Sequence, residues 1–191
     1  MNWQDYQTEF DFDGSWRDIY VFDTSIHNWQ TVIDFLRSSS YEISYTFNSD
    51  ELELPSRVED IFESWNISRN ISSVCLSVSV ASVILNCHFF SQEQIEFDID
   101  PREIKSELHA KAVFEFMRQV GQLLDKEVIL THENEEDNPI FKVVPKAEQI
   151  QYFPHGPYKS HLTDCASFGV GALAPLHPLI NGANVPAPNA S

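Results

Sequence analysis

Alternating hydrophobic and polar positions predict most of the β-strands. Four segments place an apolar side chain at every second position: residues 41–47, 74–80, 83–89 and 95–99. This period of two is typical of a strand with one face on a core and the other toward water. A shorter apolar, β-prone run at residues 19–22 predicts an earlier strand, and Ala81-Ser82 predicts a tight hairpin turn. Residues 74–100 therefore form an antiparallel meander.

Two shorter segments show helical signals. Trp29, Val32, Ile33 and Leu36 recur at helical spacing behind Thr24 and Ser25, either of which can cap the helix. Further on, residues 56–59 read S-x-x-E, the capping-box pattern in which a serine and a glutamate satisfy free backbone donors. We expect a short second helix to begin there and to end near residue 65.

The strongest single signal is a long amphipathic helix after the meander. Asp100 can act as its N-cap, Pro101 suits the first helical position and Glu103 completes a capping box. Its apolar face comprises Ile104, Leu108, Ala112, Val113, Phe116, Met117, Val120, Leu123 and Leu124. The helix is expected to end near Lys126 and to cover the core.

The remaining pattern completes a fold class and a domain plan. Residues 128–131 resume a strand, and residues 139–144 and 149–153 predict a closing hairpin. The prediction is an α+β domain at residues 1–153, with a mostly antiparallel sheet of six or seven strands and two or three helices on one face. From Pro154 the periodicity and nearly all charge disappear, so residues 154–191 are expected to form an irregular or disordered tail.

Charge narrows the choice of partner. The 191 residues carry a formal net charge of −17, from 29 acidic and 12 basic side chains. Such a field repels phosphate backbones and anionic lipids, so nucleic acid and membranes are poor partners, whereas a basic protein is a good one. The alternative is that the acidic residues only keep the domain soluble. Neither a secretion signal nor a spanning apolar run is recognisable, which predicts a cytoplasmic protein. The sequence predicts no oligomeric state.

The usual catalytic and metal-binding motifs are missing from the sequence. Cys75, Cys87 and Cys165 show no C-x-x-C spacing, so no disulfide framework or zinc site is predicted. Cys87 and His88 are neighbours on a strand and face opposite sides, which excludes a nucleophile and base pair. We predict neither a cofactor nor a metal.

Carboxylates gather at two places that could meet a partner. Glu96, Asp98 and Asp100 lie two apart on one strand and share a face. A second acidic group follows at residues 133–138, and the full set of predicted partner-binding residues is Glu96, Asp98, Asp100, Glu133, Glu135, Glu136 and Asp137. The stripe would bind a divalent cation only with help from His88 or His132, so we rank the binding of basic side chains above metal.

Three functions remain compatible with these patterns. The preferred one is a non-enzymatic domain that binds a basic protein, for example as an immunity-type inhibitor. The second is a metal-dependent hydrolase that uses Asp11, Asp13 or the acidic stripe. The third is a structural or regulatory subunit of a larger assembly that packs through exposed aromatic residues such as Trp3, Tyr6 or Trp16.

Overall fold

The computed structural model describes residues 1–67, 73–147 and 149–154. The chain divides into two units, Met1–Gly156 and Pro157–Ser191. The predicted tail lies outside the described residues, apart from Pro154 at its start. All described helices, strands and side chains belong to the first unit.

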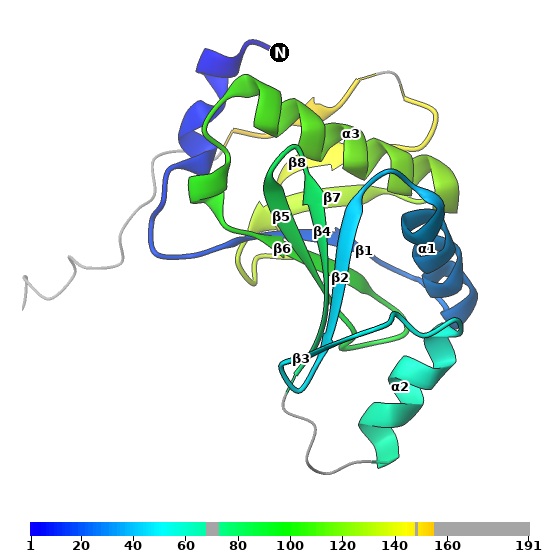
Figure 1. Ribbon diagram of the computed structural model, residues 1–191. Helices are drawn as coiled ribbons and strands as arrows, with labels where there is room; N and C mark the ends of the chain where they lie inside the picture. Colours follow the sequence, from blue (N-terminus) through cyan, green and yellow to red (C-terminus); the bar gives the residue numbers. More distant parts are fainter. Residues whose placement is uncertain (68–72, 148, 155–191) are drawn as a thin grey trace, which may run out of the picture. The chain divides into compact units, whose positions relative to one another are not determined.

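Helices separate groups of consecutive strands along the described chain (Figure 1). The helical elements are η1 (Trp3–Asp5), η2 (Gln7–Phe10), α1 (Ile26–Ser38), α2 (Val58–Ile67), η3 (Pro101–Glu103) and α3 (Glu107–Leu124), where η denotes a 3-10 helix. The strands are β1 (Arg17–Val21), β2 (Glu42–Phe47), β3 (Asp50–Leu52), β4 (Val74–Val80), β5 (Val83–His88), β6 (Ile95–Ile99), β7 (Val128–His132), β8 (Pro139–Val143) and β9 (Gln151–Tyr152).

The strands described form one antiparallel sheet in the order β3-β2-β4-β5-β6-β1-β7-β8-β9. The predicted α+β class is confirmed, but the sheet has nine strands rather than six or seven. The expected hairpin turns at Ala81 and Ser82, whose φ angles of 50° and 69° are left-handed at both central positions. This geometry matches the twist of paired strands. The strand missing from the prediction is β3, because a three-residue exposed segment carries no apolar alternation.

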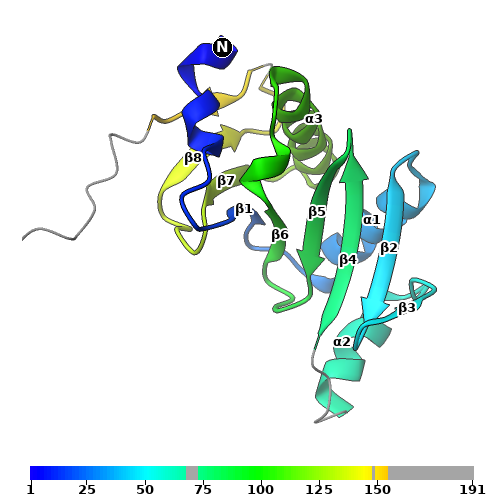
Figure 2. The ribbon, with the colours of Figure 1, turned by 60° about the vertical axis from the view of Figure 1, so that its left-hand side comes forward.

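One face of the sheet is covered and apolar, the other is open. Figures 1 and 2 show α1 and α3 on the same side, and α3 packs across β4, β7 and β8. The stripe of α1 is buried as predicted. On α3, Phe116 is fully buried and meets the ring of Phe97 at 5.1 Å, edge to face. Leu108 and Leu123 were expected on this apolar face but are 69% and 39% exposed, because both lie on the far side of the helix from the sheet.

The long helix begins later than predicted. Asp100 does cap Arg102, but the turn that follows is the short 3-10 helix η3, and α3 begins again after its N-cap Ser106. The side chain of Glu103 accepts a hydrogen bond from the backbone N–H of Ile84 at 2.7 Å. That carboxylate therefore ties η3 to the start of β5 instead of closing a capping box.

The start of α2 also differs from the prediction. The helix begins at Val58, two residues after Ser56. Its first backbone N–H donates to Gln30 Oε1 at 2.8 Å, and the Gln30 amide donates to the Ser56 carbonyl at 3.1 Å. A side chain from α1 thus satisfies the helix end, which no local capping pattern could reveal.

The N-terminal segment covers the rest of the apolar face beside α3 (Figure 1). Tyr6 is 2% exposed and packs against the rings of Phe114 and Phe141, so the expectation of an exposed Tyr6 is wrong. Arg17 of β1 binds this segment through hydrogen bonds to its backbone. Its buried guanidinium donates to the carbonyls of Glu9 and Asp11 at 2.8 and 3.0 Å.

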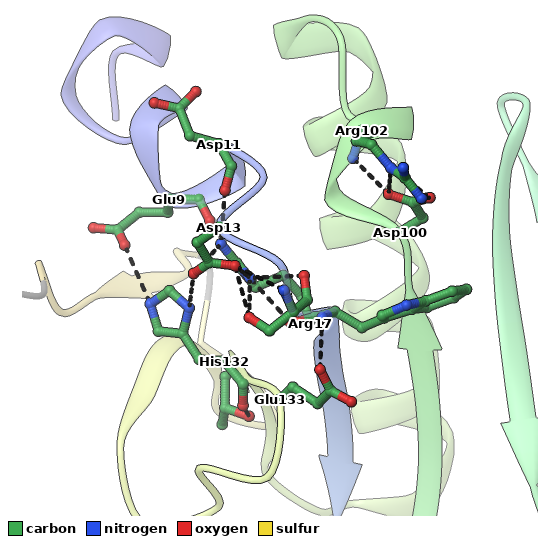
Figure 3. Close-up of polar contacts among 11 residues, drawn as sticks. Glu9, Asp11, Asp13, Arg17, Asp100, Arg102, His132 and Glu133 are labelled. Atoms are coloured by element: carbon green, nitrogen blue, oxygen red, sulfur yellow. Dashed lines mark hydrogen bonds and ion pairs between the residues drawn. The ribbon is translucent and has the colours of Figure 1, made fainter. Parts of the chain in front are cut away.

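Figure 3 shows the same guanidinium beside the carboxylate of Asp13, at 3.2 Å. His132 lies between two carboxylates, 3.9 Å from Glu9 and 3.7 Å from Asp13. Against the raising effect of burial, hydrogen bonds from Ser15 and Arg17 lower the pKa of Asp13 to about 2. The loop with Asp11 and Asp13 is therefore a clasp around Arg17, formed by the backbone carbonyl of Asp11 and the carboxylate of Asp13.

Candidate functional site

The open face of the sheet carries a row of polar residues at directly paired positions. Cross-strand pairing places Ser77 of β4 beside Asn86 of β5, then Asp98 of β6, Asp18 of β1 and Thr131 of β7. Period-two alternation produces this row, because the neighbouring positions of the same strands point into the core. Two carboxylates, Asp18 and Asp98, therefore oppose each other. Like charges at directly opposed positions destabilise a sheet.

Hydrogen bonds link the row from one strand to the next. The Ser77 hydroxyl donates to Asn86 Oδ1 at 2.9 Å, and Asn86 Nδ2 donates to Asp98 Oδ1 at 3.0 Å. The second oxygen of Asp98 lies 2.7 Å from His88 Nε2. Both oxygens of Asp98 thus have partners, and the network fixes the orientation of the imidazole.

Asp18 is an acidic side chain almost without contact to solvent. It is 3% exposed, and its Oδ2 accepts hydrogen bonds from the Tyr20 hydroxyl and the Asn134 backbone N–H, both at 2.8 Å. Burial raises the pKa of Asp18, and the negative charges of Asp98 and Glu133 add to the effect, against the two hydrogen bonds. The protein therefore holds this carboxylate where its ionised form is disfavoured.

Glu96 and His88 complete the charged group. The pKa of Glu96 is raised by burial and then by the charge of Asp18. The pKa of His88 is raised, first by the hydrogen bond to Asp98. The imidazole also stacks on the ring of Phe90, with centroids 5.0 Å apart and planes 4° from parallel. Phe90 itself is 68% exposed.

These side chains enclose a cavity of about 280 Å³ on the open face. Its lining consists of Trp16, Asp18, His88, Phe90, Glu96, Asp98, Glu133 and Asn134. Four of the eight are carboxylates, and no lysine or arginine is among them. We call this feature the acidic cavity. At neutral pH it combines surplus negative charge with an aromatic wall.

The predicted partner-binding residues separate into two groups. Glu96, Asp98 and Glu133 line the acidic cavity, and Glu133 also accepts a hydrogen bond from the Trp16 backbone N–H at 3.0 Å (Figure 3). Asp100 does not line it. Its carboxylate binds the side chain of Arg102 at 2.7 Å (Figure 3), and this interaction lowers the pKa of Asp100.

The other predicted acidic residues follow Glu133 in the β7–β8 loop. These are Glu135, Glu136 and Asp137, and the last two are exposed. The charge of Glu136 contributes to the raised pKa of Tyr20, which lies on the open face beside Asp18. The loop thus extends the negative field beyond the acidic cavity.

Neither a metal site nor a reactive thiol is evident on this face. No group of three or more histidine, cysteine and carboxylate side chains suits a metal ion within residues 1–67, 73–147 and 149–154. Cys87 is fully buried in the core, as predicted. Cys75 lies directly opposite His88 in the sheet, and this position beside the site was not predicted from the sequence. Burial and the charge of Asp98 raise the pKa of its thiol, which disfavours the nucleophilic thiolate.

Sequence reasoning missed half of the cavity lining. Asp18 had a usable signal, because a charged residue inside an otherwise buried strand is rare without a partner or a function. Phe90 had none, since it lies just outside the end of a strand, where side-chain direction does not follow from alternation. Trp16 was predicted as an exposed aromatic contact, but not as part of the acidic site. Asn134 donates its backbone N–H to Asp18, and this hydrogen bond depends on the geometry of the turn and not on the side chain.

Comparisons with family models, with curated proteins and with solved structures give no match for this chain. Among the helices of the described residues, none is both long and apolar enough to cross a membrane. Function must therefore be argued from the site itself.

Proposed function

We propose that this chain is a non-enzymatic, acidic protein-binding domain whose open sheet face binds a basic protein, with an immunity-type inhibitor as one form of that activity. One observation carries the proposal. Carboxylates from β1, β6 and the β7–β8 loop converge on one cavity whose lining contains no lysine or arginine and only one histidine, His88. A partner with lysine or arginine side chains would supply the missing positive charge.

The net charge supports the same conclusion at longer range. With 29 acidic against 12 basic residues, the chain attracts a basic protein from several ångströms away. Such steering raises the association rate and weakens as salt is added, since the screening length is about 8 Å at physiological ionic strength.

Solubility alone is a weaker explanation for this arrangement. Acidic residues that only keep a domain soluble are expected to be exposed and spread apart, because a buried carboxylate is costly. Asp18 is instead 3% exposed and directly opposite Asp98. Perturbed ionisable groups that cluster in a cavity are typical of functional sites.

An enzymatic function is the second candidate, and one contact favours it. His88 Nε2 lies 2.7 Å from Asp98, the arrangement in which a carboxylate orients a histidine as a general base. A catalytic site also needs a nucleophile or an activated water, and the thiol nearest in the sheet has a raised pKa. We therefore place catalysis second, as hydrolysis at the acidic cavity.

The test compares two double variants with equal changes in charge. Glu96→Gln with Glu133→Gln neutralises the acidic cavity, whereas Glu53→Gln with Glu63→Gln neutralises two exposed residues outside it. Each protein and the wild type are immobilised and exposed to an extract. Each protein retained by the wild type is then purified, and its affinity for the wild type and for both variants is measured at low and physiological salt.

We expect the purified partner to be basic, and its association rate to fall as salt rises. The cavity variant should bind it about tenfold or more weakly than the control variant does, because central charged contacts dominate binding energy. Equal binding by both variants, or a partner without excess positive charge, would refute the proposal. Turnover of an ester or phosphoester substrate that is lost in His88→Gln would favour the enzymatic candidate.

A further inference from the structure

The lining of the acidic cavity contains a carboxylate oxygen that accepts no hydrogen bond from the residues that the structure describes. Asp18 is 97% buried, since its exposed fraction is 3%, yet only its Oδ2 accepts hydrogen bonds. No donor from the described ranges reaches its Oδ1. A buried carboxylate oxygen without a donor costs free energy comparable to a lost hydrogen bond. A hydrogen-bond donor on a ligand that enters the acidic cavity would satisfy this atom.

We propose that the acidic cavity receives one arginine side chain of the basic partner, whose guanidinium binds among Asp18, Glu96 and Glu133. This inference rests on the proposed function and specifies the chemical group that the site recognises. From the residues that the structure describes, Glu96 accepts one hydrogen bond, from Gln94 at 3.2 Å, and Glu133 accepts one from Trp16 at 3.0 Å. Each of the three carboxylates thus keeps acceptor capacity for an entering cation.

The aromatic wall favours a planar cation. His88 and Phe90 stack within 4° of parallel, and Phe90 exposes 68% of its surface, so a flat apolar surface stands at the cavity. A guanidinium stacks on such rings and presents five donors in a fixed plane, which suits acceptors on several strands. The ammonium of lysine is compact and strongly hydrated, and it gains less from the same wall.

A bare metal ion fits the lining less well than a guanidinium. Both oxygens of Asp98 are already bound, one to Asn86 and the other to His88. The remaining carboxylates come from three separate elements, and the described residues contain no cluster with the geometry of a metal site. A larger ligand with several donors can reach carboxylates on all three elements.

Nuclear magnetic resonance titration of the full chain with N-acetyl-L-arginine amide tests the inference. The neutral N-acetyl-L-citrulline amide, which has nearly the same shape, serves as the control ligand, and N-acetyl-L-lysine amide tests the preference for a planar cation. We expect saturable shifts at the amides of Trp16, Glu96 and Asn134 with the arginine compound. Citrulline should give none, and lysine should bind several-fold more weakly.

Two single variants locate the binding. Glu96→Gln should weaken the arginine compound by about tenfold, because it removes a charged acceptor from the cavity. Glu53→Gln, which changes the net charge equally at an exposed position, should leave binding unchanged. Both variants are expected to keep the fold, and their amide spectra provide that check.

The result can separate this inference from the proposed function. If the arginine compound produces no saturable shift, or if lysine binds as tightly, the arginine cavity is wrong. A basic partner that still depends on Glu96 and Glu133 would then leave the proposed function standing. If the arginine compound binds but the purified partner binds equally well when Glu96 and Glu133 are neutralised, the proposed function fails while the arginine cavity stands.

Discussion

Replacement of Asp18 by asparagine should stabilise the fold at neutral pH. The side chain is buried opposite Asp98, and its two hydrogen-bond donors, from Tyr20 and Asn134, both point at Oδ2. Asparagine keeps one acceptor oxygen for these donors and removes the charge. Because the pKa of Asp18 is raised by burial, the neutral form is the one that the folded state prefers.

The magnitude follows from the paired carboxylates. Relief of a like-charge pair at directly opposed positions in a sheet is worth about 0.2–1 kcal/mol. For a chain of this size, that free energy raises the melting temperature by roughly 0.5–4 °C. The gain depends on pH. Below 3.8, the ordinary pKa of this group, Asp18 is protonated in the folded and the unfolded protein, so the variant has no advantage.

As pH rises above 3.8, the unfolded chain ionises Asp18 freely while the folded chain resists, so the wild type loses stability that Asp18→Asn retains. The gain is complete above the raised pKa of the folded protein. Urea unfolding of both proteins at several pH values between about 3 and 8 measures the difference directly.

Asp13→Asn is the matched control, because its expected effect on the free energy of unfolding has the opposite sign. Its side chain is 40% exposed and pairs with Arg17, and the lowered pKa of about 2 means that the folded state prefers the charge. We expect a loss of about 0.5–1 kcal/mol after allowance for solvent screening. That loss is complete above pH 3.8 and disappears as pH falls through about 2.

A clear outcome would contradict the argument about Asp18. If Asp18→Asn destabilises the protein at pH 7.5, or if its effect does not change with pH, the charged hydrogen bonds from Tyr20 and Asn134 outweigh repulsion and burial. The charge of Asp18 would then be compensated by donors within the chain, and the argument that the acidic cavity needs a cation from outside would lose its basis.

Three further predictions concern other parts of the molecule. Arg17→Met should lower the free energy of unfolding by about 2–4 kcal/mol, measured in urea, because buried acceptors lose their donor; a loss below 0.5 kcal/mol would contradict the clasp. Phe116→Ala should cost about 3–5 kcal/mol, whereas Leu108→Ala, at a position 69% exposed, should cost less than about 0.5 kcal/mol. By nuclear magnetic resonance, His88 should titrate above its ordinary 6.5, and Asp98→Asn should return it toward that value. The stabilisation from this pair is complete below 6.5 and disappears as pH rises through the pKa of the folded protein.

Most of the fold followed from the sequence because local pattern and final burial agree. The meander and its hairpin were predictable, since residues 74–80, 83–89 and 95–99 each alternate, and the structure buries every second side chain along them. The helix boundaries were less predictable because distant side chains decide them. Gln30 caps α2, and the Glu103 carboxylate accepts a hydrogen bond from the backbone N–H of Ile84 instead of capping a helix.

The candidate site was only partly predictable, for a similar reason. Alternation correctly placed Glu96 and Asp98 on the face opposite the core. It could not predict that β1 pairs with β6, which brings Asp18 beside them, because β1 precedes β6 by about 75 residues in the sequence. It also could not predict that Asp100 turns away toward Arg102.

The position of the carboxylates argues that their charge is used for recognition. A sheet gains stability from favourable cross-strand pairs, and any neutral polar residue at Asp18 would pair with Asp98 at lower cost. The chain nevertheless places Asp18, Glu96 and Asp98 together and neutralises them only with His88. A cation that enters the cavity would convert this repulsion into attraction, and the free energy released would add to binding. We therefore expect the fold to be less stable alone than it could be, and we propose that a domain binding through this cavity gains affinity from that same difference.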